Sequence, residues 1–158
     1  MGYPPRRMRT PWRTLLPVPL LVFALLLTLW AGPASAGDRA GRYREKLLGF
    51  VNDVRRDHGI KALGELSGLS DLARDHTLSM ARQRRLFHTT DLGKKVQAWR
   101  PSTWGENVGV APSIWRIVQM WERSSAHYAT MVNRSYRRAG VSVVYARGAY
   151  WATLIVIS

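Results

Sequence analysis

Three side chains in the second half of the sequence could together bind a metal ion or act as acid and base: His88, His127 and Glu106. Each histidine stands beside small hydroxyl residues at the predicted end or start of a helix, and neutral imidazole is a good zinc ligand. Glu106 lies in the apolar, glycine-containing stretch WGEN. Its carboxylate could ligate an ion, orient a histidine or do acid–base work, and it could equally accept backbone N–H bonds that hold a loop.

The other two histidines have settings that predict structural roles. His58 stands at a predicted helix end beside Gly59, where an imidazole commonly meets free carbonyl groups. His76 shares a helical face with apolar residues such as Met80, as a core histidine does. The chain has no cysteine, no nucleophile-elbow serine and no zinc-protease helix motif. If the protein is an enzyme, its chemistry is therefore expected to depend on the first three residues.

The N-terminus has the layout of an export signal. Four arginines precede an apolar run at residues 15–30, and Ala34-Ser35-Ala36 supplies the small residues that a signal peptidase reads. We therefore expect a signal peptide over residues 1–36 and a secreted or extracytoplasmic domain over residues 37–158. The alternative is a retained membrane anchor at residues 15–30, although this run is short for a bilayer span of about 20 residues.

Composition limits the class of the domain that follows. Its 122 residues suffice for one modest core, and without cysteine no disulfide can staple it. Four of the 24 basic residues lie in the leader and none of the ten acidic residues does, so the net charge falls only from +14 to +10. Outside the cytoplasm such a charge favours anionic lipids or cell-wall polymers over nucleic acid, and it could equally be a solubilising surface.

The first two thirds of the domain show helical periodicity. Apolar residues recur at three- and four-residue steps over residues 42–58 and 69–86, which predicts two amphipathic helices. Residues 89–112 lose this period and are rich in glycine and proline, which is typical of a long loop. A third helix is expected after the capping residue Ser113, and a short one at residues 126–132.

The C-terminal residues change to a strand pattern. Residues 140–145 and 150–157 are rich in β-branched and aromatic side chains and flank Arg147-Gly148, which predicts a terminal hairpin. A further short strand is predicted at residues 106–110. Helices followed by antiparallel strands indicate one α+β domain with helices packed on a sheet.

An ordered set of short motifs resembles the CAP superfamily, named for cysteine-rich secretory, antigen 5 and pathogenesis-related proteins (SCP-like domains). The set spans residues 43–157 and consists of Val51-Asn52-x-x-Arg55, Leu72-Ala73-x-x-His76, Phe87-His88-Thr89, Gly105-Glu106-Asn107-Val108, Trp121-x-x-Ser124-x-x-His127 and Gly140-Val-x-Val143. The resemblance implies an α-β-α sandwich with a small antiparallel sheet between helical layers. The short domain, with its reduced set of candidate site residues, resembles bacterial members of the superfamily.

The resemblance also implies a cleft where two histidines and two acids converge, often able to bind zinc or another divalent cation. The matching residues are His88, His127 and Glu106. The second acid belongs three residues after Trp121, where this chain has Ser124. Glu122 cannot replace it, because two helical residues correspond to a rotation of about 200°.

These observations favour a secreted, monomeric binding module, not an enzyme, that engages an anionic lipid, a sterol, a cell-wall component or another protein. The alternative is a metal-dependent hydrolase in which His88 and His127 hold the ion and Glu106 is the base. A third class is a purely structural extracytoplasmic domain in which both histidines only hold loops in place.

Overall fold

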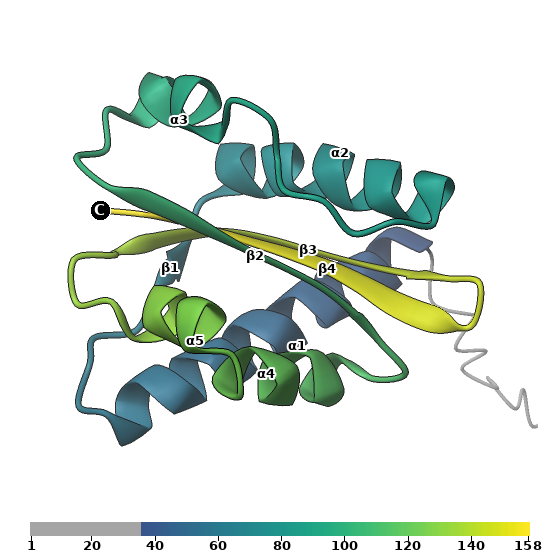
Figure 1. Ribbon diagram of the computed structural model, residues 1–158, viewed down its shortest axis with the longest axis horizontal. Coiled ribbons are helices and arrows are strands. Elements are labelled where there is room, and N and C mark those ends of the chain that lie inside the picture. The colour runs from purple at the N-terminus through teal and green to yellow at the C-terminus, as the bar shows by residue number, and fades with distance from the viewer. Residues whose placement is uncertain (1–35) are drawn as a thin grey trace, which may run out of the picture. The chain divides into compact units, whose positions relative to one another are not determined.

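A four-stranded sheet forms the middle of the computed structural model, which describes residues 36–158 (Figure 1). The strand order is β1-β3-β4-β2, and the strands are β1 Gly64–Glu65, β2 Trp104–Ala111, β3 Arg138–Ala146 and β4 Ala149–Ile157. β3 and β4 form the predicted hairpin, whose turn has positive φ at both Arg147 (55°) and Gly148 (80°). Two positive φ angles in a two-residue loop match the right-handed twist of the strands. β2 pairs antiparallel with β4, so β2 is one edge of the sheet.

Helices cover both faces of this sheet (Figure 1). On one face lie α2 Ser67–Gln83, α3 Leu92–Lys95 and the 3₁₀ helix η1 Val96–Trp99; on the other lie α1 Ala36–Asp57, α4 Ile114–Glu122 and α5 Ser125–Val132. The larger apolar core joins α1 and α4 to the sheet, with Leu47, Trp121 and Leu154 among its buried members. A smaller core under α2 includes Leu69 and Ile155. The α-β-α sandwich is therefore confirmed.

Several details differ from the sequence prediction. The sheet is mixed and not purely antiparallel, because the two-residue β1 pairs in parallel with β3. α1 begins at Ala36, whereas the apolar period predicted a start at residue 42. The predicted loop at residues 89–112 contains α3 and η1, each of four residues, and β2 is longer than the predicted strand.

The predicted leader, including its apolar run, lies outside the described residues. Among the helices that the structure describes, none combines the length and the apolar character needed to cross a bilayer.

Arg55 joins the loop after α1 to the end of α5 and to the segment that follows α5. The side chain is fully buried and donates to four backbone carbonyl groups, those of Lys61, Met131, Asn133 and Tyr136. A guanidinium can serve so many acceptors because its five N–H groups are arranged in a rigid plane. The arginine thereby fixes the end of α5, the helix that carries one of the candidate site residues.

Candidate functional site

Glu106 is the buried centre of the candidate site. Its side chain is only 3% exposed and accepts three hydrogen bonds. The donors are His88 Nδ1 at 2.7 Å, the backbone N–H of Thr89 at 2.9 Å and the Thr89 hydroxyl at 2.5 Å. Hydrogen bonds to an ionised carboxylate are stronger than neutral ones, so this cluster firmly attaches the loop after α2 to β2.

The alternation of side chains along β2 explains how one strand serves both halves of the site. Glu106 lies on the face of α2, as does Val108, which packs with Met80. Asn107 lies on the opposite face, where its Nδ2 donates to the backbone carbonyl of His127 at 2.9 Å. Because β2 is at the edge of the sheet, side chains on its two faces can approach each other around that edge.

His127 has a different partner from His88. It lies in the first turn of α5, and its Nδ1 is 2.8 Å from the hydroxyl of Ser124, the residue just before the helix. Burial lowers the pKa of His127 below its ordinary value of 6.5, and the nearby charge of His88 lowers it further. The imidazole of His127 is therefore favoured in its neutral form.

The two histidines are held through the same ring nitrogen, Nδ1. A carboxylate only accepts hydrogen bonds, so the Nδ1 of His88 carries the proton and its Nε2 keeps a lone pair when the ring is neutral. In His127, too, Nδ1 is the nitrogen engaged by a neighbouring side chain. Hydrogen bonding of one ring nitrogen to an outer partner is the usual way in which proteins orient histidine toward a ligand.

His76 and His58 have the structural roles that their sequence settings predicted. His76 is buried, and its Nε2 donates to the carbonyl of Phe87 at 2.7 Å, which holds the residue before His88. It also lies 4.0 Å from Glu106. His58 bonds the carbonyl of Val54 through Nδ1 and the hydroxyl of Tyr128 through Nε2, so it joins the end of α1 to α5.

The donor atoms limit what metal the site could hold. Over residues 36–158, no group of three or more histidine, cysteine or acidic side chains is arranged to hold an ion. Both oxygens of Glu106 already accept hydrogen bonds, and Ser124 offers a neutral hydroxyl. Two imidazole nitrogens fit a loosely held ion and fall short of the three protein ligands of catalytic zinc sites. Metal binding by His88, His127 and Glu106 stays a prediction.

Thr89 is a site residue to which the sequence analysis gave no role. It is buried, and both its backbone and its hydroxyl bind Glu106 across 17 residues of sequence. Its position directly after His88 was visible in the sequence, but no spacing rule connects a loop threonine with an acid on a distant strand. Asn107 is similar, since its bond to the backbone of α5 depends entirely on the fold.

The α-β-α sandwich is shared with several solved structures. An extracellular protein of Bacillus anthracis that contains an SCP domain aligns with a TM-score of 0.67 and 20% identity, covering 80% of this chain and 45% of that one. An outer surface protein of Borrelia burgdorferi gives 0.67 and 14%, covering 74% and 92%. A cysteine-rich secretory protein of Staphylococcus aureus gives 0.64 and 22%, covering 76% and 40%.

The family model for CAP, the cysteine-rich secretory protein family, matches residues 48–156, and the chain belongs to this family. The match confirms the family predicted from the ordered motifs. Comparison with curated proteins finds no match. The chain spans less than half the length of the Bacillus anthracis protein and 92% of the Borrelia protein.

Proposed function

We propose that this chain is an extracytoplasmic CAP binding module that is not itself a hydrolase. The observation that carries the proposal is the state of Glu106: its buried carboxylate is fully engaged by His88 and Thr89. A general base must reach a water or substrate proton, and Glu106 is already used to orient a histidine and a loop. Ser124 stands in place of the family's second acid, so that position supplies no carboxylate that could act as a base.

The two histidines are proposed to contact the ligand through their Nε2 atoms. An ion such as Zn²⁺ could bind there, with water or partner atoms as its other ligands, and would supply a positive charge to attract an anionic group. A solved neighbour, NaASP2, contains Zn²⁺; it aligns with a TM-score of 0.55 and 14% identity. Two protein ligands predict weak binding of zinc, because structural zinc sites use four protein ligands.

The predicted export and the basic composition support an envelope ligand. The solved neighbours include an extracellular protein and an outer surface protein. Without the predicted leader the domain has a net charge of +10, and a positively charged domain is attracted to an anionic surface. We therefore propose that the ligand is an anionic lipid, a sterol, a cell-wall component or a protein, and that the domain acts as a monomer without nucleic acid.

The test combines ion binding and envelope binding. Calorimetry with ZnCl₂ should show saturable binding to the wild type and its loss in the double variant His88→Ala/His127→Ala. His58→Gln is the matched control, since it removes a histidine whose two nitrogens have structural partners. In parallel, co-sedimentation should show saturable binding to phosphatidylglycerol vesicles, sterol-containing vesicles or purified cell wall.

The same experiment separates the three classes. Zinc retention with hydrolysis of an ester or peptide substrate would favour the metal-dependent hydrolase. No binding to ion or envelope material, together with a large loss of stability in the double variant, would favour the purely structural domain. Either result would overturn the binding module.

A further inference from the structure

Five aromatic side chains form a strip that runs from the hairpin onto α1 and α4. Tyr145 and Tyr150 come from the hairpin, Tyr43 and Phe50 from α1, and Trp115 from α4. The ring centroids of Tyr145 and Tyr150 are 4.8 Å apart, and those of Tyr150 and Tyr43 are 5.3 Å apart. Those of Phe50 and Trp115 are 5.2 Å apart. One hollow of about 150 Å³ is lined by members of both groups, so the five residues form a continuous surface, which we call the aromatic strip.

The aromatic strip is open to solvent at both of its ends. Tyr145 is 55% exposed and Trp115 is 47% exposed, the two highest values among the large apolar side chains that the structure describes. The other three members are partly buried and pack against the larger core, which fixes the strip to the body of the domain. Single exposed apolar residues are common on protein surfaces, whereas a contiguous set of them marks an interaction surface.

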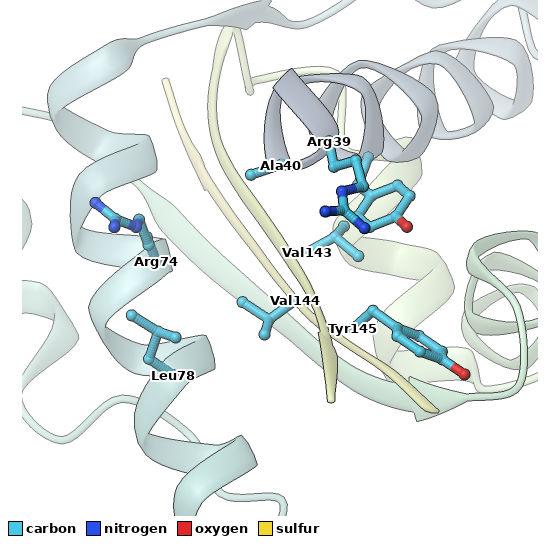
Figure 2. A pocket seen from close by; sticks show the side chains of 8 residues that line it. Arg39, Ala40, Arg74, Leu78, Val143, Val144 and Tyr145 are labelled. Atoms are coloured by element: carbon cyan, nitrogen blue, oxygen red, sulfur yellow. The ribbon is translucent and has the colours of Figure 1, made fainter. Parts of the chain in front are cut away.

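Basic side chains accompany the aromatic strip. Residues 39, 43, 46 and 50 recur at four- and three-residue steps, so Arg39 and Lys46 share a face of α1 with the two aromatic residues of that helix. Figure 2 shows Arg39 and Tyr145, which line a hollow of about 360 Å³ beside the end of β3. Arg147 is exposed in the hairpin turn between Tyr145 and Tyr150. Residues 36–50 contain four basic and two acidic residues, so the surface around the strip is positively charged.

We propose that the aromatic strip docks this domain on the surface of an anionic lipid bilayer. Tyrosine and tryptophan are enriched at the headgroup level of membranes, because their rings are amphipathic. Lysine and arginine beside such a surface are attracted by its anionic headgroups, and their long side chains let the charge stay in water while the apolar stem lies on the rings. Trp115 and Tyr145 would enter between the headgroups, and Arg39 and Lys46 would contact the phosphates. The inference rests on the extracytoplasmic location proposed above and not on the histidine site.

The form of the strip favours a bilayer surface over an enclosed molecule or a glycan. The hollow between α1 and α4 measures about 150 Å³, whereas pockets that enclose a small ligand usually measure about 300–1,000 Å³. A glycan would need hydrogen-bonding side chains for its hydroxyl groups. Ser113, which lines this hollow, already accepts a hydrogen bond from Arg116 N as the cap of α4. Exposed rings with cations beside them therefore fit a bilayer surface best.

The helix that carries part of the strip is also where the chain enters the domain. The apolar run of the predicted leader ends at residue 30, and α1 begins at Ala36, so that Arg39 belongs to its first turn. If the run is retained as an anchor, only residues 31–35 separate it from this helix, which would keep the strip near the bilayer. If the run is cleaved, the strip itself would provide the contact with the membrane.

The test uses residues 37–158, because the apolar run of the full chain could bind a bilayer by itself. All buried members of the three apolar cores lie in this range, so the domain keeps the packing it needs to fold, and circular dichroism checks each variant. Co-sedimentation compares vesicles of equal parts phosphatidylglycerol and phosphatidylcholine with vesicles of phosphatidylcholine alone. We expect saturable binding to the anionic vesicles that Arg39→Gln/Lys46→Gln weakens by about tenfold or more. The control Lys61→Gln/Lys95→Gln removes the same charge at two exposed lysines that line neither hollow, and it should bind nearly as the wild type does.

Tryptophan quenching identifies the face that docks. Trp115 belongs to the aromatic strip, whereas Trp104 is exposed to a similar extent, 42%, at the opposite end of the sheet, where it pairs with Ile157. Vesicles whose acyl chains carry bromine quench a tryptophan that reaches them. We expect quenching of the wild type that is largely lost in Trp115→Phe and kept in Trp104→Phe. Neither change alters the charge, so the result does not depend on electrostatic attraction.

Loss of quenching in Trp115→Phe, together with weaker binding of Arg39→Gln/Lys46→Gln, would support the proposal. Equal binding of the two charge variants, quenching that depends on Trp104, no binding to anionic vesicles, or strip-dependent binding to purified cell wall alone would overturn it. The variant His88→Ala/His127→Ala should dock as the wild type does, and the strip variants should keep the zinc affinity of the wild type. A failure of the docking surface is therefore distinguishable from a failure of the function proposed for the histidine site.

Discussion

The two histidines of the candidate site are held through the same ring nitrogen by chemically different partners. His88 Nδ1 meets a buried carboxylate at 2.7 Å, and His127 Nδ1 meets the hydroxyl of Ser124 at 2.8 Å. The distances are alike, but the Glu106 carboxylate only accepts hydrogen bonds, whereas the Ser124 hydroxyl can donate or accept one. Similar distances therefore hide a chemical asymmetry between the two halves of the site.

This asymmetry assigns different tasks to the two halves. The Glu106 half is an anchor, since the carboxylate joins β2 to the loop that carries His88 and Thr89. The Ser124 half is a local contact between the residue that precedes α5 and the first turn of that helix. Removing the first partner should affect stability most, and replacing the second should mainly affect the ligand-binding properties of His127.

The largest effect is expected for Glu106→Ala. This change leaves two donors of buried Thr89 and one of His88 without their acceptor, and it should lower the free energy of unfolding by about 3 kcal/mol. Urea denaturation followed by circular dichroism measures the loss. Glu106→Gln keeps an acceptor and should lose less. Glu122→Ala, at an exposed acid, should change the stability by under about 0.5 kcal/mol.

If Glu106→Ala lowered the free energy of unfolding no more than Glu122→Ala does, the prediction that Glu106 anchors the loop to β2 would be wrong. The two halves of the site would then be equally local.

The next effect is expected for Ser124→Glu, which restores an acid at the position where the family pattern has one. A carboxylate that accepts from His127 Nδ1 makes the ring more basic, and hydrogen-bond partners of a metal-binding histidine typically change metal affinity by about tenfold or more. Calorimetry with ZnCl₂ should therefore show tighter binding. Ser124 makes no side-chain cap bond to α5, so the helix should lose little stability.

The matched control is Ser125→Glu, which adds the same charge one residue further along, where a side chain points away from His127. Equal affinity for zinc in both variants would mean that only net charge matters, and it would remove the reason for treating Ser124 as the missing acid.

The sequence predicted the layers of the fold because their signals are local. Apolar periodicity marks the helices, and β-branched residues around Arg147-Gly148 mark the hairpin. Elements with little local signal were missed: β1 has two residues, and α3 and η1 have four each, which is too short for a period to develop. The first turns of α1 contain Gly37 and Gly41, whose low helix propensity hides the start of the helix.

The sequence predicted which residues belong to the site but not the hydrogen bonds that they form. The residue types identified His88, His127 and Glu106, and the motif order placed Ser124 at the missing acid. Whether Glu106 would ligate, catalyse or hold a loop could not be decided, because that depends on Thr89, which reaches it only after β2 and the loop are folded. Hydrogen bonds between distant segments are a property of the tertiary structure and leave no spacing pattern.

The smallest expected effect concerns the pH dependence of stability contributed by His127. Its folded pKa is lowered by burial and by the charge of His88, so the unfolded chain binds the proton more readily. The contribution is therefore fully present above the unfolded pKa of about 6.5 and is lost as the pH falls through the folded pKa. Because His127 is only partly buried, solvent screening keeps this contribution small.

The measurement is the urea midpoint of unfolding between pH 8 and pH 5 for the wild type and for His127→Gln. The difference between the two proteins at each pH isolates the contribution of His127. The wild type should lose stability relative to the variant as the pH falls. In the Ser124→Glu background the sign should reverse, because the new carboxylate raises the folded pKa of His127 and its protonation then favours the folded state. A difference that has the same slope in both backgrounds would show that Ser124 does not control His127, and the contrast between the two halves of the site would fail.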